Sequence, residues 1–340
     1  MATTARPASD TKRSGGDLTG RSYAAREKPG FDGAAAIAAG AAEAPGRSRL
    51  LAPQIRILRL HQWSKNILVF AALVSSHHFT ATAFAQALAA FVAFSLCASA
   101  AYIVNDLVDV AADRAHPVKR DRPLASAALP IAHGIAIAPL LLMAAAAVAL
   151  WLPLTFGVIL AAYVAVNLCY SLILKRKMLV DVITLAGLYT LRVFAGAAAI
   201  GVSVSEWLLA FSMFIFLALA LVKRHSELVL RLDAGMPDPD DRDYRAVDRP
   251  VLIALAAASG FAAVVVFALY VSSPAQLPLY HHARRLYLIC PLFLYWFARI
   301  LMRSNRGELP DDPVVFALKD PVSLATAALT AIVIAAATYP

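Results

Sequence analysis

The sequence predicts an all-α polytopic membrane protein with nine transmembrane helices, and three observations support this fold class. Hydrophobic residues make up 60% of the 340 positions and charged residues only 16%, which is too apolar for a soluble domain of this length. Apolar runs of about 20 residues, the length that crosses a bilayer, recur along most of the chain. The charged residues, with a formal net charge of +9, lie between these runs without the aromatic interleaving that nucleic-acid binding uses.

The N-terminal part of the chain differs from the rest. Residues 1–50 are rich in Ala, Gly, Ser and Pro and contain no long apolar stretch, so they are predicted to form a disordered tail. They also lack the apolar segment of a cleaved signal peptide, and the first membrane helix is therefore expected to act as the insertion signal. Residues 51–340 are predicted to form one transmembrane domain of nine helices.

The predicted helices follow one another with short connections. The first helix is the shortest, and the connections at 150–153 and 201–206 are tight enough to require antiparallel neighbours. An odd number of crossings places the two termini on opposite sides of the membrane. The predicted helices are 62–79, 82–104, 129–150, 153–174, 180–201, 206–230, 249–272, 283–302 and 321–338.

The distribution of basic residues predicts the orientation. Connections after the second, fourth, sixth and eighth helices are rich in Lys and Arg, whereas those on the other side hold only Arg284 and Arg285. Because Lys and Arg in short loops stay in the cytoplasm, the N-terminus is predicted to be cytoplasmic. The C-terminus is then expected on the opposite side of the inner (plasma) membrane, and any chemistry at the cytoplasmic face.

Three aspartates follow the second predicted helix in the segment NDLVDVAAD. Asp106, Asp109 and Asp113 are spaced at i, i+3 and i+7, so on a continuous helix they share an arc of roughly 60°. Like charges on one face repel each other unless a cation lies among them. Mg²⁺ is held by one or two carboxylates together with phosphate oxygens of a substrate. The spacing therefore predicts a magnesium site.

Basic residues follow the aspartates closely. Lys119, Arg120 and Arg122 are able to hold phosphate as point charges or through bidentate hydrogen bonds. Carboxylates, a divalent ion and basic side chains together predict a pyrophosphate site. The alternative is a solvated loop whose charges mark only the ends of two helices.

The fifth predicted helix carries two charged residues on one face. Asp181 lies at its start and Arg192 lies 11 residues later, about three turns along. An arginine near mid-span costs about 2.5–3.5 kcal/mol on insertion scales, so such a residue normally lines a cavity or meets a partner. We interpret Arg192 as a functional residue, with a structural contact to another helix as the alternative. Lys175, just before this helix, is explained equally well as a substrate ligand or as a membrane-surface anchor.

The sixth predicted helix ends in further charges. Lys223 and Arg224 lie on the same side as the aspartates, although Lys223 and Glu227 have the i, i+4 spacing of a self-neutralising pair. The connection over residues 231–249 is long enough to cover a site as a lid. Its candidate residues are Arg242, Tyr244 and Arg245.

With these motifs placed, the chain from about residue 52 onward resembles the UbiA-type superfamily of intramembrane prenyltransferases. The resemblance implies a nine-helix bundle with a cytoplasm-facing central cavity, in which two Asp-bearing loops bind Mg²⁺ and a pyrophosphate. It assigns Asp106, Asp109 and Asp113 to the first half of the catalytic and metal site. Asp181 is the matching position in the second half.

Within that superfamily, the segments HQWSKN, DRAHPVKRDRPLAS and VDVITLAGLYTLRVFAGA look more like the decaprenyl-phosphate phosphoribosyltransferase branch. Members that prenylate aromatic acceptors usually carry a second Asp or a polar cluster in the second motif, whereas this chain has only Asp181 there. The branch implies transfer of a 5-phosphoribosyl group from phosphoribosyl pyrophosphate to a polyprenyl phosphate. The expected substrate-binding residues are Lys65, Asn105, Lys119, Arg120, Arg122, Tyr170, Lys175, Arg192, Lys223 and Arg224.

Two other functions stay open at this point. One is a prenyltransferase that moves a polyprenyl group from its diphosphate to an aromatic or other lipophilic acceptor. The other is a membrane transporter, in which Arg192 belongs to a conduction path. The charges gather at one face and we see no convincing inverted repeat around a midplane site, which disfavours the transporter.

Overall fold

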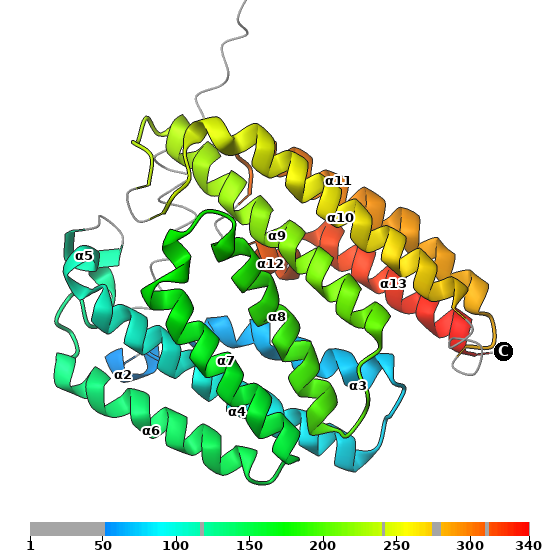
Figure 1. Ribbon diagram of the computed structural model, residues 1–340, viewed down its shortest axis with the longest axis horizontal. Helices are drawn as coiled ribbons and strands as arrows, with labels where there is room; N and C mark the ends of the chain where they lie inside the picture. The colour runs from blue at the N-terminus through cyan, green and yellow to red at the C-terminus, as the bar shows by residue number, and fades with distance from the viewer. Residues whose placement is uncertain (1–51, 116–118, 240–241, 274–279, 310–312, 340) are drawn as a thin grey trace, which may run out of the picture.

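The computed structural model describes residues 52–115, 119–239, 242–273, 280–309 and 313–339. The predicted disordered tail at 1–50 lies outside these residues. Within the described part of the chain, the secondary structure is entirely helical (Figure 1). The all-α prediction is therefore confirmed.

The helices are α helices and 3-10 helices, the latter labelled η. Their bounds are α2 (Pro53–Arg56), η2 (Leu60–Phe70), α3 (Ala71–Ser75), α4 (Ala81–Val108), α5 (Val110–Ala115), η3 (Lys119–Asp121), α6 (Ile131–Ala149), α7 (Leu154–Leu172), η4 (Leu174–Arg176), α8 (Val180–Ala199), α9 (Glu206–Asp233), η5 (Ala246–Asp248), α10 (Arg249–Ser272), η7 (Ala283–Leu288), α11 (Ile289–Asn305), α12 (Pro313–Lys319) and α13 (Pro321–Thr338).

Eight of the predicted crossings correspond to helices long and apolar enough to span a membrane among the described residues. The first predicted crossing, 62–79, differs, because it is built from η2, with 11 residues, followed by α3, with 5. A 3-10 helix rises about 2.0 Å per residue, so η2 and α3 together extend roughly 30 Å, the thickness of the hydrocarbon core. The segment formed by η2 and α3 is thus long enough to be the ninth crossing.

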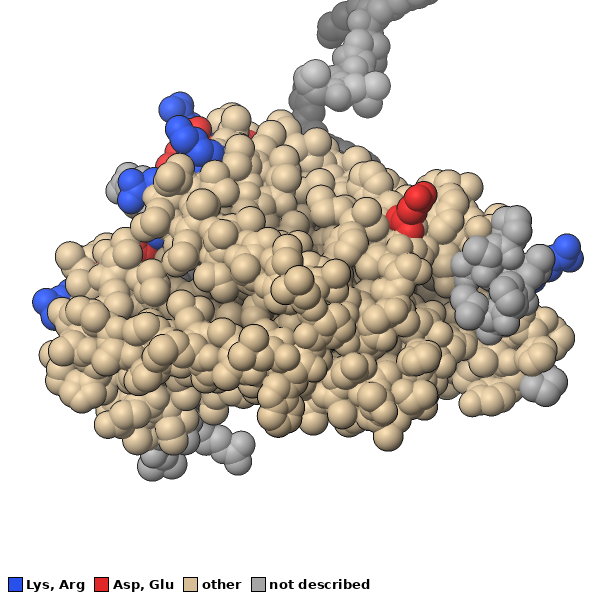
Figure 2. All heavy atoms as spheres, turned by 60° about the horizontal axis from the view of Figure 1, so that its bottom comes forward, with Lys and Arg blue, Asp and Glu red and all other residues tan. Residues whose placement is uncertain are grey.

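The two ends of the bundle differ in what they carry. In Figure 1, α2, α5 and the connection between α9 and α10 lie at one end, whereas α3 and the C-terminus lie at the other. The described chain therefore begins and ends at opposite ends of the molecule, as an odd number of crossings requires. Seen from the direction of Figure 2, the broad side of the bundle is almost entirely uncharged, as expected of a surface that faces lipid.

Helices α4 and α8 form the centre of the bundle. Their most apolar windows are each 56% buried inside the protein, against 17% for α6 and α13, which face outward. Helix α8 packs against α4, α7, α9 and η2. The elements that carry the aspartates are therefore the two central helices and their immediate extensions.

A glycine on α8 permits the close approach of η2. An ideal Cβ built at Gly196 lies only 1.8 Å from the backbone oxygen of Val69. No residue with a side chain fits there unless the two backbones move apart. Gly187, on the same helix, has no atom within 4 Å of its ideal Cβ.

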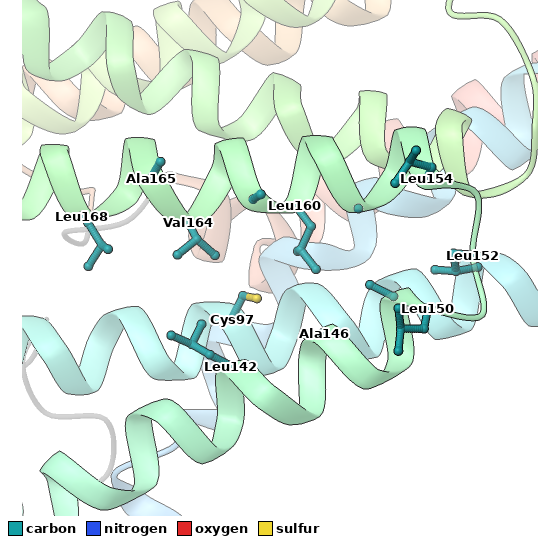
Figure 3. A pocket seen from close by; sticks show the side chains of 13 residues that line it. Cys97, Leu142, Ala146, Leu150, Leu152, Leu154, Leu160, Val164, Ala165 and Leu168 are labelled. Atoms are coloured by element: carbon teal, nitrogen blue, oxygen red, sulfur yellow. The ribbon is translucent and has the colours of Figure 1, made fainter.

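An apolar groove of about 680 Å³ lies on the outer side between α6 and α7 (Figure 3). Its lining includes Cys97 of α4, Leu142 of α6 and Leu160 and Leu168 of α7, and no charged residue. This groove is a lipid-facing feature and not the central cavity expected at the charged end. That cavity stays a prediction.

Replacement of Gly196 tests the contact between η2 and α8. Gly196→Ala is expected to lower the free energy of unfolding by about 1–3 kcal/mol, because the added methyl group overpacks the contact with Val69. Thermal unfolding in detergent measures the effect. Gly187→Ala is the matched control and is expected to be neutral or slightly stabilising, since alanine favours a helix more than glycine does. Equal melting temperatures for the two variants would contradict this account of the packing.

Candidate active site

The first cluster of charges forms where α4 ends and α5 begins. Asp106 and Asp113 are both buried, with relative exposures of 2%. Nη1 of Arg122 lies 3.2 Å from Oδ1 of Asp106 and 2.6 Å from Oδ2 of Asp113. Nη2 of Arg59 donates to both oxygens of Asp106, at 2.5 and 2.7 Å. The two buried carboxylates therefore converge on one cationic nitrogen, and a second arginine holds the first of them.

Asp109 is directed to a different partner. It lies at a bend between α4 and α5, with φ −93° and ψ 7°, and it is only partly buried. Nζ of Lys175, in η4, lies 3.0 Å from Oδ2 of Asp109, and Nδ2 of Asn105 donates to the same oxygen at 3.1 Å. The expected single arc of three carboxylates is thus interrupted by the bend, and the three aspartates make two sets of contacts.

The second cluster surrounds Asp181 in the first turn of α8. Asp181 is fully buried and accepts a hydrogen bond of 2.6 Å from Nε of Arg224, which is itself 2% exposed. Arg224 also binds Glu227 at 2.6 Å and the hydroxyl of Tyr170 at 3.3 Å. Nη1 of Arg242 lies 3.9 Å from Oδ2 of Asp181. The charge of Asp181 is therefore compensated by arginines from α9 and from the following connection.

We call these two clusters the α4–α5 group and the α8–α9 group. The α4–α5 group consists of Asp106, Asp109, Asp113, Arg59, Arg122 and Lys175. The α8–α9 group consists of Asp181, Glu227, Arg224 and Arg242.

One segment contacts both groups. Tyr170, in the last turn of α7, reaches Arg224 of the α8–α9 group, and Lys175, in η4, reaches Asp109 of the α4–α5 group. The two residues are only five positions apart along the chain, with the end of α7 between them. The two halves of the predicted site therefore lie at the same end of the bundle and share the segment that ends α7.

The connection between α9 and α10 covers Asp181. Tyr244 is buried, with 3% exposure, and its hydroxyl donates to Oδ1 of Asp181 while accepting from the backbone N–H of Leu179 at 2.8 Å. Burial and the hydrogen bond to Asp181 raise the pKa of Tyr244, so the hydroxyl keeps its proton and remains a donor. The predicted lid residues Arg242 and Tyr244 thus reach the site, whereas the side chain of Arg245 is exposed and its backbone N–H bonds to Asp248.

Arg192 is buried among protein groups in the middle of α8. Its guanidinium donates to Oδ1 of Asn66 at 2.8 Å, to the backbone oxygen of Leu188 at 2.7 Å and to the hydroxyl of Tyr163 at 2.9 Å. It also lies over the rings of Tyr163 and Tyr189, at 4.9 and 5.1 Å from their centroids. These contacts match the structural alternative for Arg192, and substrate binding by this residue stays a prediction.

The other expected substrate-binding residues lie in four places. Lys65 is buried in η2, next to Asn66. Lys119 and exposed Arg120 are in η3, just before Arg122. Lys223 is partly buried on α9 beside Arg224, and Glu227 pairs with Arg224 and Arg242. Asn105 contributes through its hydrogen bond to Asp109.

Two residues of the site network were not predicted from the sequence. Arg59 is separated from Asp106 by 47 residues, and no local spacing relates them. Asn66 links Arg192 to α4 through a hydrogen bond of 3.0 Å to Ser95. The only signal for Arg59 was its place beside the interfacial segment that begins the first crossing. Among the described residues, no three His, Cys, Asp or Glu side chains come close enough together to hold a metal ion on their own.

This fold, with its charged groups at one end of the bundle, is that of a polytopic membrane protein. A model of the UbiA prenyltransferase family matches residues 66–318, so the chain belongs to that family, and the match places it among transferases.

Relatives with curated names cover different shares of the chain. The chain is 37% identical to the uncharacterized protein y4nM of Sinorhizobium fredii, over 84% of this chain but only 56% of that protein. It is 34% identical to nodulation protein NoeC of Azorhizobium caulinodans, over 78% of this chain and 87% of that protein. It is 36% identical to the decaprenyl-phosphate phosphoribosyltransferase of Mycolicibacterium smegmatis, over 55% of this chain and 60% of that protein.

The fold is also similar to that of a solved structure. The structure of a UbiA homolog from Archaeoglobus fulgidus bound to GPP and Mg²⁺ superposes with a TM-score of 0.62, over 83% of this chain and 97% of that chain. The sequence identity is 16%, so the likeness establishes the fold alone.

Replacement of Tyr244 tests whether the connection is held over Asp181. Tyr244→Phe removes two hydrogen bonds and is expected to lower the free energy of unfolding by about 1–2 kcal/mol. It is also expected to speed tryptic cleavage at Arg242 and Arg245, which limited proteolysis in detergent measures. Tyr295→Phe, at a residue 59% exposed on α11, is the matched control and is expected to change neither quantity. Unchanged cleavage of Tyr244→Phe would show that other contacts hold the connection.

Proposed function

We propose that the protein transfers a 5-phosphoribosyl group from phosphoribosyl pyrophosphate to a membrane-embedded polyprenyl phosphate and releases pyrophosphate. The observation that supports this most directly is the number of basic side chains in the two groups. Three carboxylates face three basic residues in the α4–α5 group, and two face two arginines in the α8–α9 group. So many basic side chains suit two polyanionic substrates better than one diphosphate and a neutral acceptor.

Mg²⁺ is the proposed cofactor, and the residues fit it chemically. Carboxylate oxygens are the ligands that Mg²⁺ prefers, and Asp106 and Asp113 already converge on one cationic nitrogen. Asp109 and Asp181 are the further carboxylates proposed to hold the ion. When bound, the ion stabilises the negative charge that develops on the departing pyrophosphate.

The basic residues of the two groups are proposed to position the phosphates. A phosphate oxygen of the acceptor forms a bond to the anomeric carbon of the ribosyl group as the bond from that carbon to pyrophosphate breaks. The reaction needs no protein nucleophile. The negative charge of the phosphates and of the departing pyrophosphate is proposed to be held by the basic residues beside the carboxylates, which are Arg122, Lys175 and Arg224. Tyr244 and the α9–α10 connection keep water from Asp181.

The proposed orientation follows from the same charges. Basic connections gather at the end of the bundle that carries the two groups, so that end is proposed to face the cytoplasm, with the C-terminus on the other side of the plasma membrane. The soluble donor then reaches the site from the cytoplasm. The lipid acceptor enters from the bilayer between helices.

A prenyltransferase that joins a polyprenyl diphosphate to a lipophilic acceptor is the second candidate. The observation in its favour is the fold neighbour from Archaeoglobus fulgidus, which is bound to GPP, a prenyl diphosphate, and Mg²⁺. In that reaction the same aspartates hold a lipid diphosphate, and the acceptor carries no phosphate.

Labelled donor distinguishes the two candidates. Purified protein is incubated with Mg²⁺, phosphoribosyl pyrophosphate labelled in the ribose and a polyprenyl phosphate, and the lipid is then extracted. The proposed function predicts label in the lipid phase and an equal amount of released pyrophosphate. If the label stays in the aqueous phase while a polyprenyl diphosphate is consumed in the presence of an aromatic acceptor, the second candidate is correct.

Asparagine variants test the role of the aspartates. Asp109→Asn and Asp113→Asn are expected to slow pyrophosphate release by about 100-fold or more, because each loses a charge proposed to hold the ion at the leaving group. Chelation of Mg²⁺ is expected to abolish the wild-type activity, and added Mg²⁺ to restore it. Glu206→Gln, in the first turn of α9 at the opposite end of the bundle, is the control. Normal rates in folded aspartate variants would rule out the proposed site.

A further inference from the structure

Arg122 has an unusual position in the α4–α5 group. One nitrogen of its guanidinium lies within 3.2 Å of two carboxylates that are both buried, Asp106 and Asp113. Its own side chain is 26% exposed, and it lies in the turn that follows the three-residue helix η3. The position between the two carboxylates is therefore held by a partly exposed residue of the connection between α5 and α6.

Arg59 contacts the same group in a different way. It donates to both oxygens of Asp106, and its guanidinium lies over the ring of Tyr102, 5.1 Å from the centroid. Nη2 of Arg59 bonds to both oxygens of Asp106 and so restricts the direction of that carboxylate, and the stacking restricts Arg59 itself. Arg59 is thus suited to remain in place while Arg122 moves.

We infer that Arg122 and a divalent cation compete for Asp106 and Asp113. Arg59 is the positioning residue, which keeps the Asp106 carboxylate directed at the position that Arg122 or the cation occupies. The inference rests on the proposed function, because it concerns the ion of the same site. It adds an order to binding: the ion gains full access to the two carboxylates only when Arg122 is drawn away by the phosphates of the donor.

The charges of the group explain this order. Its three carboxylates are balanced by Arg59, Arg122 and Lys175, so a divalent ion entering alone adds two uncompensated charges beside three cations. A guanidinium does not lose its proton in proteins, so Arg122 relieves the repulsion only by moving. A pyrophosphate brings the anionic oxygens that pair with Arg122, and the ion and the donor therefore favour each other's binding.

Direct metal binding tests the inference without turnover. The full chain, purified in detergent and without donor, is titrated with Mn²⁺, and free Mn²⁺ is followed by electron paramagnetic resonance. Arg122→Gln is expected to lower the Kd for Mn²⁺ by about tenfold or more, because one repelling charge leaves, Asp113 is released and Asp106 keeps only Arg59. An unchanged or higher Kd in Arg122→Gln would overturn the inference.

Two further variants separate competition from a general change in charge or folding. Arg56→Gln removes the same charge at the same end of the bundle, from a guanidinium that donates to the backbone oxygen of Asp121, and is expected to leave the Kd within about twofold. Arg122→Lys keeps the charge and is expected to bind Mn²⁺ as weakly as the wild type. Tight binding by all three variants would overturn the inference, and melting temperatures identify any variant that has not folded.

The outcome is distinguishable from that of the proposed function. Tighter Mn²⁺ binding by Arg122→Gln, together with wild-type protein that transfers no label from phosphoribosyl pyrophosphate, would uphold the competition and reject the reaction. Label transfer by the wild type with no effect of Arg122→Gln on Mn²⁺ would do the reverse.

Discussion

Ion pairing of buried carboxylates at one end of the bundle is the constraint on which the rest of the site depends. An ionised carboxylate loses several kcal/mol of hydration on burial, by order of magnitude, and persists only with a close and well-bonded partner. Asp106 finds that partner in Arg59, and Asp181 finds it in Arg224. Both partners come from distant elements, so the pairs also determine which helix ends lie together.

The need of buried polar groups for a bonded partner extends into the bundle, where η2 crosses beside the two central helices. A 3-10 helix has poorer backbone hydrogen bonds than an α helix, and in an apolar environment its stability depends on neighbours. Hydrogen bonds between side chains connect η2 to these neighbours: Trp63 donates to Ser99, Asn66 donates to Ser95, and Arg192 donates to Asn66. The mid-span arginine therefore secures the first crossing, and η2 in turn places Arg59 against Asp106.

Apolar length alone was sufficient to predict the eight regular crossings, because the bilayer sets their minimum length. It was insufficient for η2, since the mixed polar and apolar sequence LHQWSKNILVF also suits an α helix with 3.6 residues per turn. The spacing of Asp106, Asp109 and Asp113 predicted that these residues lie near one another. It did not predict the bend at Asp109 or the contact of Asp109 with Lys175, which comes from another element. Arg59 could not be found from sequence, as nothing local relates it to Asp106. The loop length over 231–249 indicated a lid, and only the fold shows that Tyr244 is the residue which reaches Asp181.

Charge balance also bears on which acceptor the site favours. In each group every carboxylate holds at least one cation, so a substrate that binds there must offer those cations an alternative anion. A polyprenyl phosphate does so, because its phosphate is able to pair with Lys175 or Arg224, while the proposed Mg²⁺ compensates the carboxylate of Asp109 or Asp181 that is released. A neutral phenol provides no such replacement, and its binding leaves the ion pairs intact. In the proposed reaction the acceptor's phosphate and the donor's pyrophosphate together supply anions for these cations, whereas with an uncharged acceptor the donor's diphosphate alone would supply them.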